Sequence, residues 1–143
     1  MKKLIIITSV LTLAAVAYGF YLYNKPHQSI AKEKAAYSLS AEQLYSQFDS
    51  NEEGANKTYL GKVIAVDGRI EQFTRDEKGN MNIYLATGGM NVVSCQMESK
   101  SMKQTASLLP GDKVTLKGIC TGMLMDIVLV DCVIAENILR SKN

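Results

Sequence analysis

Alternating apolar and polar residues predict five β-strands between Lys62 and Ala135. The first three are joined by tight turns, one of them containing Gly79 and the other formed by Gly88-Gly89, and they predict a meander. A polar stretch then separates them from the last two strands. The five expected ranges are 62–73, 81–87, 92–97, 113–121 and 126–135.

The side chains that should point into the interior follow from this alternation. In the first strand Gly68 falls on the inward side, which predicts a bulge or bend there. The last strand is apolar almost throughout, so two inward registers are open. We favour the register that leaves Asp131 outside the core. In this register the inward residues are Val128, Val130, Cys132 and Ile134.

Three short helices are expected around these strands. Ser40 and Gln43 form a capping box, and the residues behind it place Leu44 and Phe48 on one apolar helical face. A second helix is expected from Glu52 to about Thr58, and a third ends near Leu109. The first two should pack on an open end or edge of the barrel.

The N-terminal segment is long and uncharged. The 20 residues from Leu4 to Tyr23 carry no charge, and a helix of about 1.5 Å per residue would cross roughly 30 Å of bilayer. One interpretation is an uncleaved transmembrane anchor; the other is a signal peptide cleaved near Ala17. We favour the anchor because the apolar run continues past Ala17 and ends in aromatic residues.

This interpretation divides the chain into five parts. They are a cytoplasmic tail over 1–3, the anchor or signal peptide over 4–23, a tether over 24–38, a folded β domain over 39–137 and a tail over 138–143. A single-pass protein of the inner (cytoplasmic) membrane is expected, with its domain facing the periplasm or the exterior; cleavage would instead give a secreted protein. Without Lys2 and Lys3 the chain has 14 basic and 14 acidic residues, a poor electrostatic match for nucleic acid.

Catalytic chemistry has little support in the sequence. The single histidine, His27, falls in the expected tether, so the domain lacks the commonest catalytic base. The cysteines at 95, 120 and 132 have no C-x-x-C spacing, so neither a zinc site nor any other metal or cofactor site is expected. Asp67 and Asp131 are the only carboxylates that we consider for an enzyme.

The cysteines leave two interpretations open. Cys120 and Cys132 belong to consecutive strands and would form a disulfide in an oxidising compartment. All three cysteines also fall on expected inward positions, where a free thiol packs as a small apolar side chain. We favour free thiols.

Several short stretches resemble the bacterial tRNA-anti-like family of OB folds. They include Val66-Asp67-Gly68-Arg69-Ile70, Leu109-Pro110-Gly111-Asp112 and Val130-Asp131-Cys132. The resemblance covers roughly residues 38–136. With the order of three strands, a helix and two strands, it implies a mainly β fold: a five-stranded Greek-key OB-type barrel with one or two short N-terminal helices, preceded by the transmembrane helix.

A ligand-binding face is expected where OB folds usually bind, across the second and third strands and the loops beside them. Four candidate residues fall there: Arg69, Phe73, Arg75 and Tyr84. Phe73 and Tyr84 would either stack on a ligand or pack across strands. The apolar hairpin tip Met123-Leu124-Met125 would either cap the barrel or face a partner.

Three functions remain as hypotheses. The first is a noncatalytic module that binds a protein, peptide or glycan outside the cytoplasm. The second is single-stranded nucleic-acid binding, which rests on analogy of fold. The third is an uncharacterised enzyme.

Overall fold

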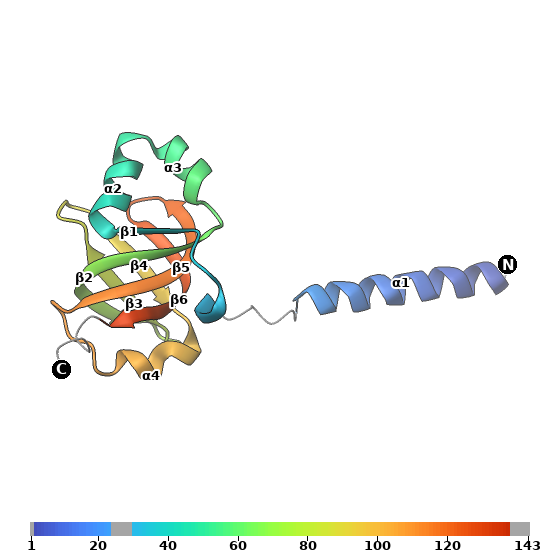
Figure 1. Ribbon diagram of the computed structural model, residues 1–143. Helices are drawn as coiled ribbons and strands as arrows, with labels where there is room; N and C mark the ends of the chain where they lie inside the picture. The colour runs from blue at the N-terminus through green and yellow to red at the C-terminus, as the bar shows by residue number, and fades with distance from the viewer. Residues whose placement is uncertain (1, 24–29, 138–143) are drawn as a thin grey trace.

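The core of the molecule is a closed β-barrel, shown in Figure 1. The computed structural model describes residues 2–23 and 30–137, so His27 with residues 24–29 of the expected tether, and the tail over 138–143, lie outside the described residues. Five strands form the barrel in the order β2-β3-β4-β6-β5, and pairing of β2 with β5 closes the ring. They are β2 Val63–Arg75, β3 Met81–Ala86, β4 Val92–Met97, β5 Lys113–Met123 and β6 Ile127–Asn137.

This arrangement confirms the mainly β class, the five strands and the closed barrel. Strands β2, β3 and β4 are antiparallel neighbours and form the expected meander, while β6 lies parallel to β4 and antiparallel to β5. The Greek-key ordering stays a prediction. Inward side chains fill the interior, among them Val66, Ile83 and Leu116, each with no exposed surface.

Helices cover the two ends of the barrel in Figure 1, with α2 and α3 at one end and α4 at the other. Helix α2 spans Ala41–Ser50, α3 spans Glu52–Tyr59, and the 3₁₀ turn η2 Ser99–Ser101 precedes α4 Met102–Thr105. The expected capping box is confirmed, because the Gln43 amide donates to Ser40 Oγ and the Ser40 amide donates to Gln43 Oε1, both at 3.1 Å. Leu44 and Phe48 of α2 enter the core.

A sixth strand, β1 Tyr37–Ser40, runs parallel to β2. It occupies residues that the sequence suggested were tether or helix cap. Its four residues include two serines and are too few to show a clear alternation. Before it, the 3₁₀ turn η1 Ile30–Lys32 buries Ile30 against Val63 and Val133.

Helix α1 spans Lys2–Tyr23, where the sequence predicted a helix. In the part of the chain that the structure describes, no helix combines the length and the apolar character needed to cross a bilayer. The transmembrane span expected over 4–23 is therefore not confirmed.

Strand β6 resolves the choice of inward register with a bulge. Ile127 and Leu129 are buried, the pairing with both neighbouring strands shifts after Leu129, and Cys132 is buried again. Asp131 lies in this irregularity with φ 52°, a left-handed conformation that aspartate adopts more readily than most residues. The expected inward positions are thus wrong for Val128 and Val130 and confirmed for Cys132, and Asp131 stays out of the core.

All three cysteines are buried free thiols. Cys132 lies close to the thiol of Cys95 on the neighbouring strand β4. Burial raises the pKa of the Cys120 thiol, and burial followed by the Cys95 contact raises the pKa of Cys132 well above its usual value.

We expect titration of the unfolded, unreduced chain with a thiol reagent to give three free thiols. Under oxidised glutathione the folded chain should react slowly, because the thiolate is the attacking form and the pKa values of Cys120 and Cys132 are raised. Any disulfide that forms should join Cys95 to Cys132 and disappear in Cys95→Ser. Peptide mapping that finds a bridge between Cys120 and Cys132 would contradict this expectation.

Candidate binding face

The outer surface of strands β3 and β4, with the adjoining part of β2, carries two cross-strand rows of uncharged polar side chains, next to the exposed Glu71 of the β2 bulge and the apolar pair Ala86 and Val92. Gln72, Tyr84 and Ser94 lie opposite one another in the first row, and Thr74, Asn82 and Gln96 form the second. Their outward direction follows from the alternation, because Ile83, Leu85, Val93 and Cys95 between them are fully buried. These six residues are called the β3–β4 face below.

Tyr84 is the one aromatic residue of the β3–β4 face. Its side chain is half-buried, and its hydroxyl lies 3.2 Å from Thr74 Oγ1 in a hydrogen bond across β2 and β3. This contact fixes the position of the ring against the sheet. Tyr84 therefore presents a flat apolar surface beside amide and hydroxyl groups that can donate and accept hydrogen bonds.

The other expected residues of this face lie elsewhere. A shift in register between Ile70 and Gln72 moves the following residues of β2 by one position, so Phe73 lies opposite Ile83 and packs against the core. Arg75 lies opposite Met81 at the end of the strand. Arg69 is exposed, and its Nη1 donates to the carbonyl of Gly111 at 2.7 Å. Of the four candidates, the structure places only Tyr84 on the β3–β4 face.

An apolar rim borders one end of this face. Leu124 and Met125 are 93% and 82% exposed, whereas Met123 is partly buried and packs against the core. Met90, in the loop between β3 and β4, is fully exposed at 100%. The apolar rim, defined as Met90, Leu124 and Met125, therefore includes one residue that the sequence analysis missed, although Met90 directly follows the Gly88-Gly89 turn.

Two hydrogen bonds hold the loops of the apolar rim together. Asn91 Nδ2 donates to the carbonyl of Met125, and the amide of Val92 donates to Asp126 Oδ1 at 3.1 Å. At the hairpin tip Met123 packs against the core, while Leu124 and Met125 are exposed, and contact of the tip with a partner stays a prediction.

The β2–β3 hairpin borders the opposite end of the face and is organised by Asp76. Its Oδ1 accepts hydrogen bonds from the amides of Lys78 and Asn80 at 2.9 and 2.8 Å, and its Oδ2 accepts one from Asn80 Nδ2 at 2.7 Å. The side-chain hydrogen bond from Asn80 is the main cause of the lowered pKa of the Asp76 carboxyl.

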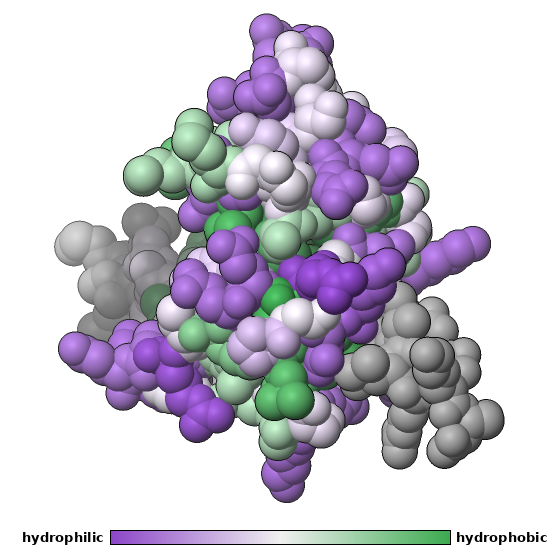
Figure 2. Space-filling model, turned by 90° about the vertical axis from the view of Figure 1, so that its left-hand side faces the viewer, coloured by the Kyte–Doolittle hydropathy of each residue, from purple (hydrophilic) through white to green (hydrophobic). Residues whose placement is uncertain are grey.

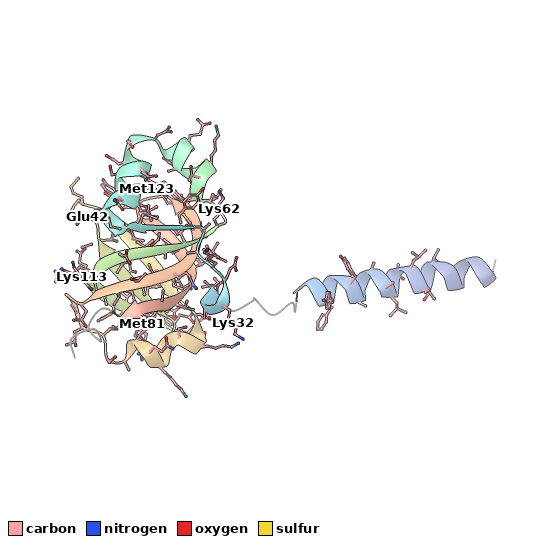
Figure 3. The ribbon with its side chains drawn as sticks, in the orientation of Figure 1. Lys32, Glu42, Lys62, Met81, Lys113 and Met123 are labelled. Carbon is pink, nitrogen blue, oxygen red and sulfur yellow. The ribbon has the colours of Figure 1, made fainter. Side chains whose placement is uncertain are left out.

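A groove of about 610 Å³ lies where β1, α2, β2 and β5 meet, and it extends to Ala86 and Gly88 at the end of β3. It is lined by two acidic and two basic residues, Glu42, Asp67, Arg69 and Lys113. Glu42 and Lys113 lie on one side of the molecule in Figure 3, and Figure 2 shows on that side polar residues around a small apolar area. The Asp67 carboxylate accepts a hydrogen bond from the Thr115 hydroxyl at 2.5 Å.

The groove contains one of the two carboxylates considered for catalysis, and Asp131 lies outside its walls. Over residues 2–23 and 30–137, no three side chains of the types histidine, cysteine, aspartate or glutamate are grouped as metal ligands. The structure thus places Asp67, Arg69 and Lys113 along the same groove.

Comparison with known proteins assigns the fold to a family. The family model described as tRNA_anti-like matches residues 1–134. This chain belongs to the tRNA_anti-like family. No curated protein sequence matches it.

Solved structures are similar to this tRNA_anti-like protein at low sequence identity. A "putative nucleic acid-binding lipoprotein" from Klebsiella pneumoniae subsp. pneumoniae MGH 78578 is 18% identical, with a TM-score of 0.58 over 68% of this chain and 91% of that chain. The S. pombe Stn1-Ten1 complex is 18% identical, with a TM-score of 0.41 over 48% and 53%. Aspartyl tRNA synthetase from Entamoeba histolytica is 11% identical, with a TM-score of 0.44 over 78% and 24%. The first of these supports an OB fold.

We expect the β2–β3 hairpin to loosen when Asp76 is protonated or replaced. Because its folded-state pKa is lowered, this carboxylate contributes stability above the unfolded pKa and loses it as the pH falls through the folded value, below 3.8. In Asp76→Ala the amides of Lys78 and Asn80 should exchange faster with solvent at neutral pH, and Glu77→Ala serves as the neighbouring control. Unchanged hydrogen exchange at Lys78 and Asn80 would contradict the role given to Asp76.

Proposed function

We propose that this protein is a noncatalytic binding module that recognises a protein, peptide or glycan through the β3–β4 face. The observation that carries the proposal is the chemistry of the face: five uncharged polar side chains around one ordered tyrosine. Amides and hydroxyls offer directed hydrogen bonds to an uncharged polar ligand, and OB folds bind oligosaccharides as well as oligonucleotides on this surface.

The apolar rim supports a partner that extends beyond the face. Met90, Leu124 and Met125 are exposed on two loops that hydrogen bonds hold side by side. Exposed apolar residues grouped next to a polar face are typical of interaction surfaces. A ligand lying across β3 and β4 would reach this rim at one end and the Asp76 hairpin at the other.

Single-stranded nucleic acid is the second candidate ligand. Membership of the tRNA_anti-like family and the description of the Klebsiella protein favour it, and the Tyr84 ring could stack on a base. The charge of the face favours the first candidate, because nucleic-acid affinity depends largely on lysine and arginine near phosphates. Of the two candidate arginines, Arg69 is held by Gly111, and Arg75 lies at the end of β2 beyond Thr74.

The same proposal includes attachment to the inner membrane through the N-terminal segment, with the barrel facing the periplasm or the exterior. Its support is the uncharged sequence from Leu4 to Tyr23 and the exposed apolar side chains of α1, such as Leu13, Val16 and Phe20 at 68%, 71% and 66%. Such a surface would be stable in contact with lipid. Secretion after cleavage near Ala17 is the alternative outcome.

Adding positive charge to the face should create affinity for oligonucleotides that the natural chain lacks. We expect the wild type to show no retention of a labelled fifteen-nucleotide oligo(dT) at low salt, and Asn82→Lys/Gln96→Lys to bind it with an affinity that falls steeply with salt. Gln104→Lys/Ser107→Lys adds the same charge at exposed positions on and after α4 and should not bind. Salt-sensitive binding by the wild type that Tyr84→Ala weakens would favour the nucleic-acid function instead.

Membrane attachment is tested separately by fractionation. We expect the full chain to remain with membranes after alkaline extraction, and a chain that begins at Ser29 to be released. In a second variant, replacement of Leu13 and Val16 by lysine should lower retention, because charge in an apolar helix opposes contact with lipid. If the wild-type chain were released and had become shorter, cleavage would be indicated. Its release at full length would contradict attachment.

A further inference from the structure

Strand β1 ends the sheet on one side. It pairs along one edge with β2, and among the described residues no strand lies on its other edge. In a parallel pair each strand directs the N–H and C=O groups of alternate residues to its neighbour. Because the Ala36 amide donates to the carbonyl of Val63 on β2, the backbone groups of Tyr37 and Leu39 point away from β2. An edge of this kind is a template for one more strand.

A groove of about 560 Å³ runs beside this edge, between β1 and α2. Tyr37, Ser38 and Leu39 form one wall, and Tyr59 contributes an aromatic surface. The other wall is the exposed polar side of α2, with these residues: Glu42, Gln43, Ser46 and Gln47. The groove therefore lies between the backbone groups of β1 that point away from β2 and the side chains of α2 that can form hydrogen bonds.

The aromatic part of the groove is held in place by contacts of its own. The rings of Tyr37 and Tyr59 meet edge to face, with centroids 5.2 Å apart and planes at 82°. The Tyr59 hydroxyl donates a hydrogen bond to Gln47 Oε1 at 2.5 Å, and this contact connects α3 to α2. Because these side chains are already held in place, less conformational entropy is lost when a ligand binds in the groove.

Opposite charges mark the two ends of β1. Lys62 Nζ lies 5.3 Å from the centre of the Tyr37 ring at the start of the strand, and Glu42 lines the groove just beyond its last residue. Figure 3 shows Lys62 and Glu42 at opposite ends of this strand. A peptide that runs antiparallel to β1 would place its amino terminus near Glu42 and its carboxylate near Lys62. A parallel peptide would meet a like charge at each end.

We propose that the β1 edge binds a short extended peptide with free termini, about four residues long, as an added strand antiparallel to β1. Main-chain hydrogen bonds to β1 supply the affinity, and the charges of Glu42 and Lys62 set the direction. This site is separate from the β3–β4 face, because none of the six residues of that face lines the groove beside β1.

The test uses the full chain in detergent micelles and two pools of random tetrapeptides. One pool has free termini, and the other is acetylated and amidated. In two-dimensional amide NMR spectra, the free pool should shift the signals of residues 37–40 and of Gln43 and Gln47, and the blocked pool should shift them less at equal concentration. No shift at residues 37–40, or shifts confined to the β3–β4 face, would overturn the proposal.

Charge variants test the direction of the peptide. Glu42→Gln and Lys62→Gln should each weaken binding of the free pool about two- to fivefold, as expected for exposed ion pairs, and leave the blocked pool unchanged. Glu52→Gln is the control for Glu42, since Glu52 also lies in the first turn of a helix, and Lys78→Gln is the control for Lys62. Equal loss for both pools would overturn the role of the termini.

Replacing Tyr84 by alanine separates this site from the proposed function. Binding of the free pool at β1 should not change in Tyr84→Ala, whereas recognition through the β3–β4 face should weaken. The oligo(dT) experiments with the wild type and the lysine variants could reject the β3–β4 face while the free peptide pool still shifts the amide signals of residues 37–40. In that case the peptide site stands without the proposed function. Loss of the shifts at residues 37–40 in Tyr84→Ala would overturn it.

Discussion

The whole barrel depends on the way in which one long strand, β2, pairs with three others. The part from Val63 to Arg69 pairs with β5, and the part from Ile70 onward pairs with β3. Gly68 lies just before this change of partner, and a Cβ atom there would lie 3.0 Å from Leu85 Cβ and 3.3 Å from Ala41 Cβ. A side chain at this position would push β3 or the start of α2 away from β2, so glycine allows the close packing at this point of the barrel.

Closure in turn decides which edges and faces remain for binding. Because β2 is occupied by β5 and β3 along the barrel, the extra strand β1 pairs with it opposite β5, over Ile64 to Asp67. That leaves β1 as a short edge strand beside α2. The β3–β4 face lies on the barrel wall instead, where all backbone groups are used within the sheet and recognition must come from side chains. The two proposed sites therefore use different chemistry.

The bulges have the largest effect on the chemistry of the barrel surface. One extra residue between Ile70 and Gln72 turns Phe73 toward the core and places Gln72 and Thr74 outside. The bulge at Asp131 keeps that carboxylate out of the core while β6 continues to supply apolar side chains on both sides of it. Without the first bulge, the alternation would turn Phe73 and Arg75 outward in place of Gln72 and Thr74.

The sequence by itself determined the elements: the meander, the order of strands and helix, the Ser40 capping box and most of the core. These depend on local periodicity, on short-range hydrogen bonds and on apolar burial, all of which can be recognised along the chain. Tertiary structure decided the placement of Phe73, the partner of Cys132, the strand β1 and the contribution of Met90 to the apolar rim. Each of these depends on a register shift or on a contact between distant segments, and a shift of one residue moves a side chain to the opposite face without changing the pattern along the chain.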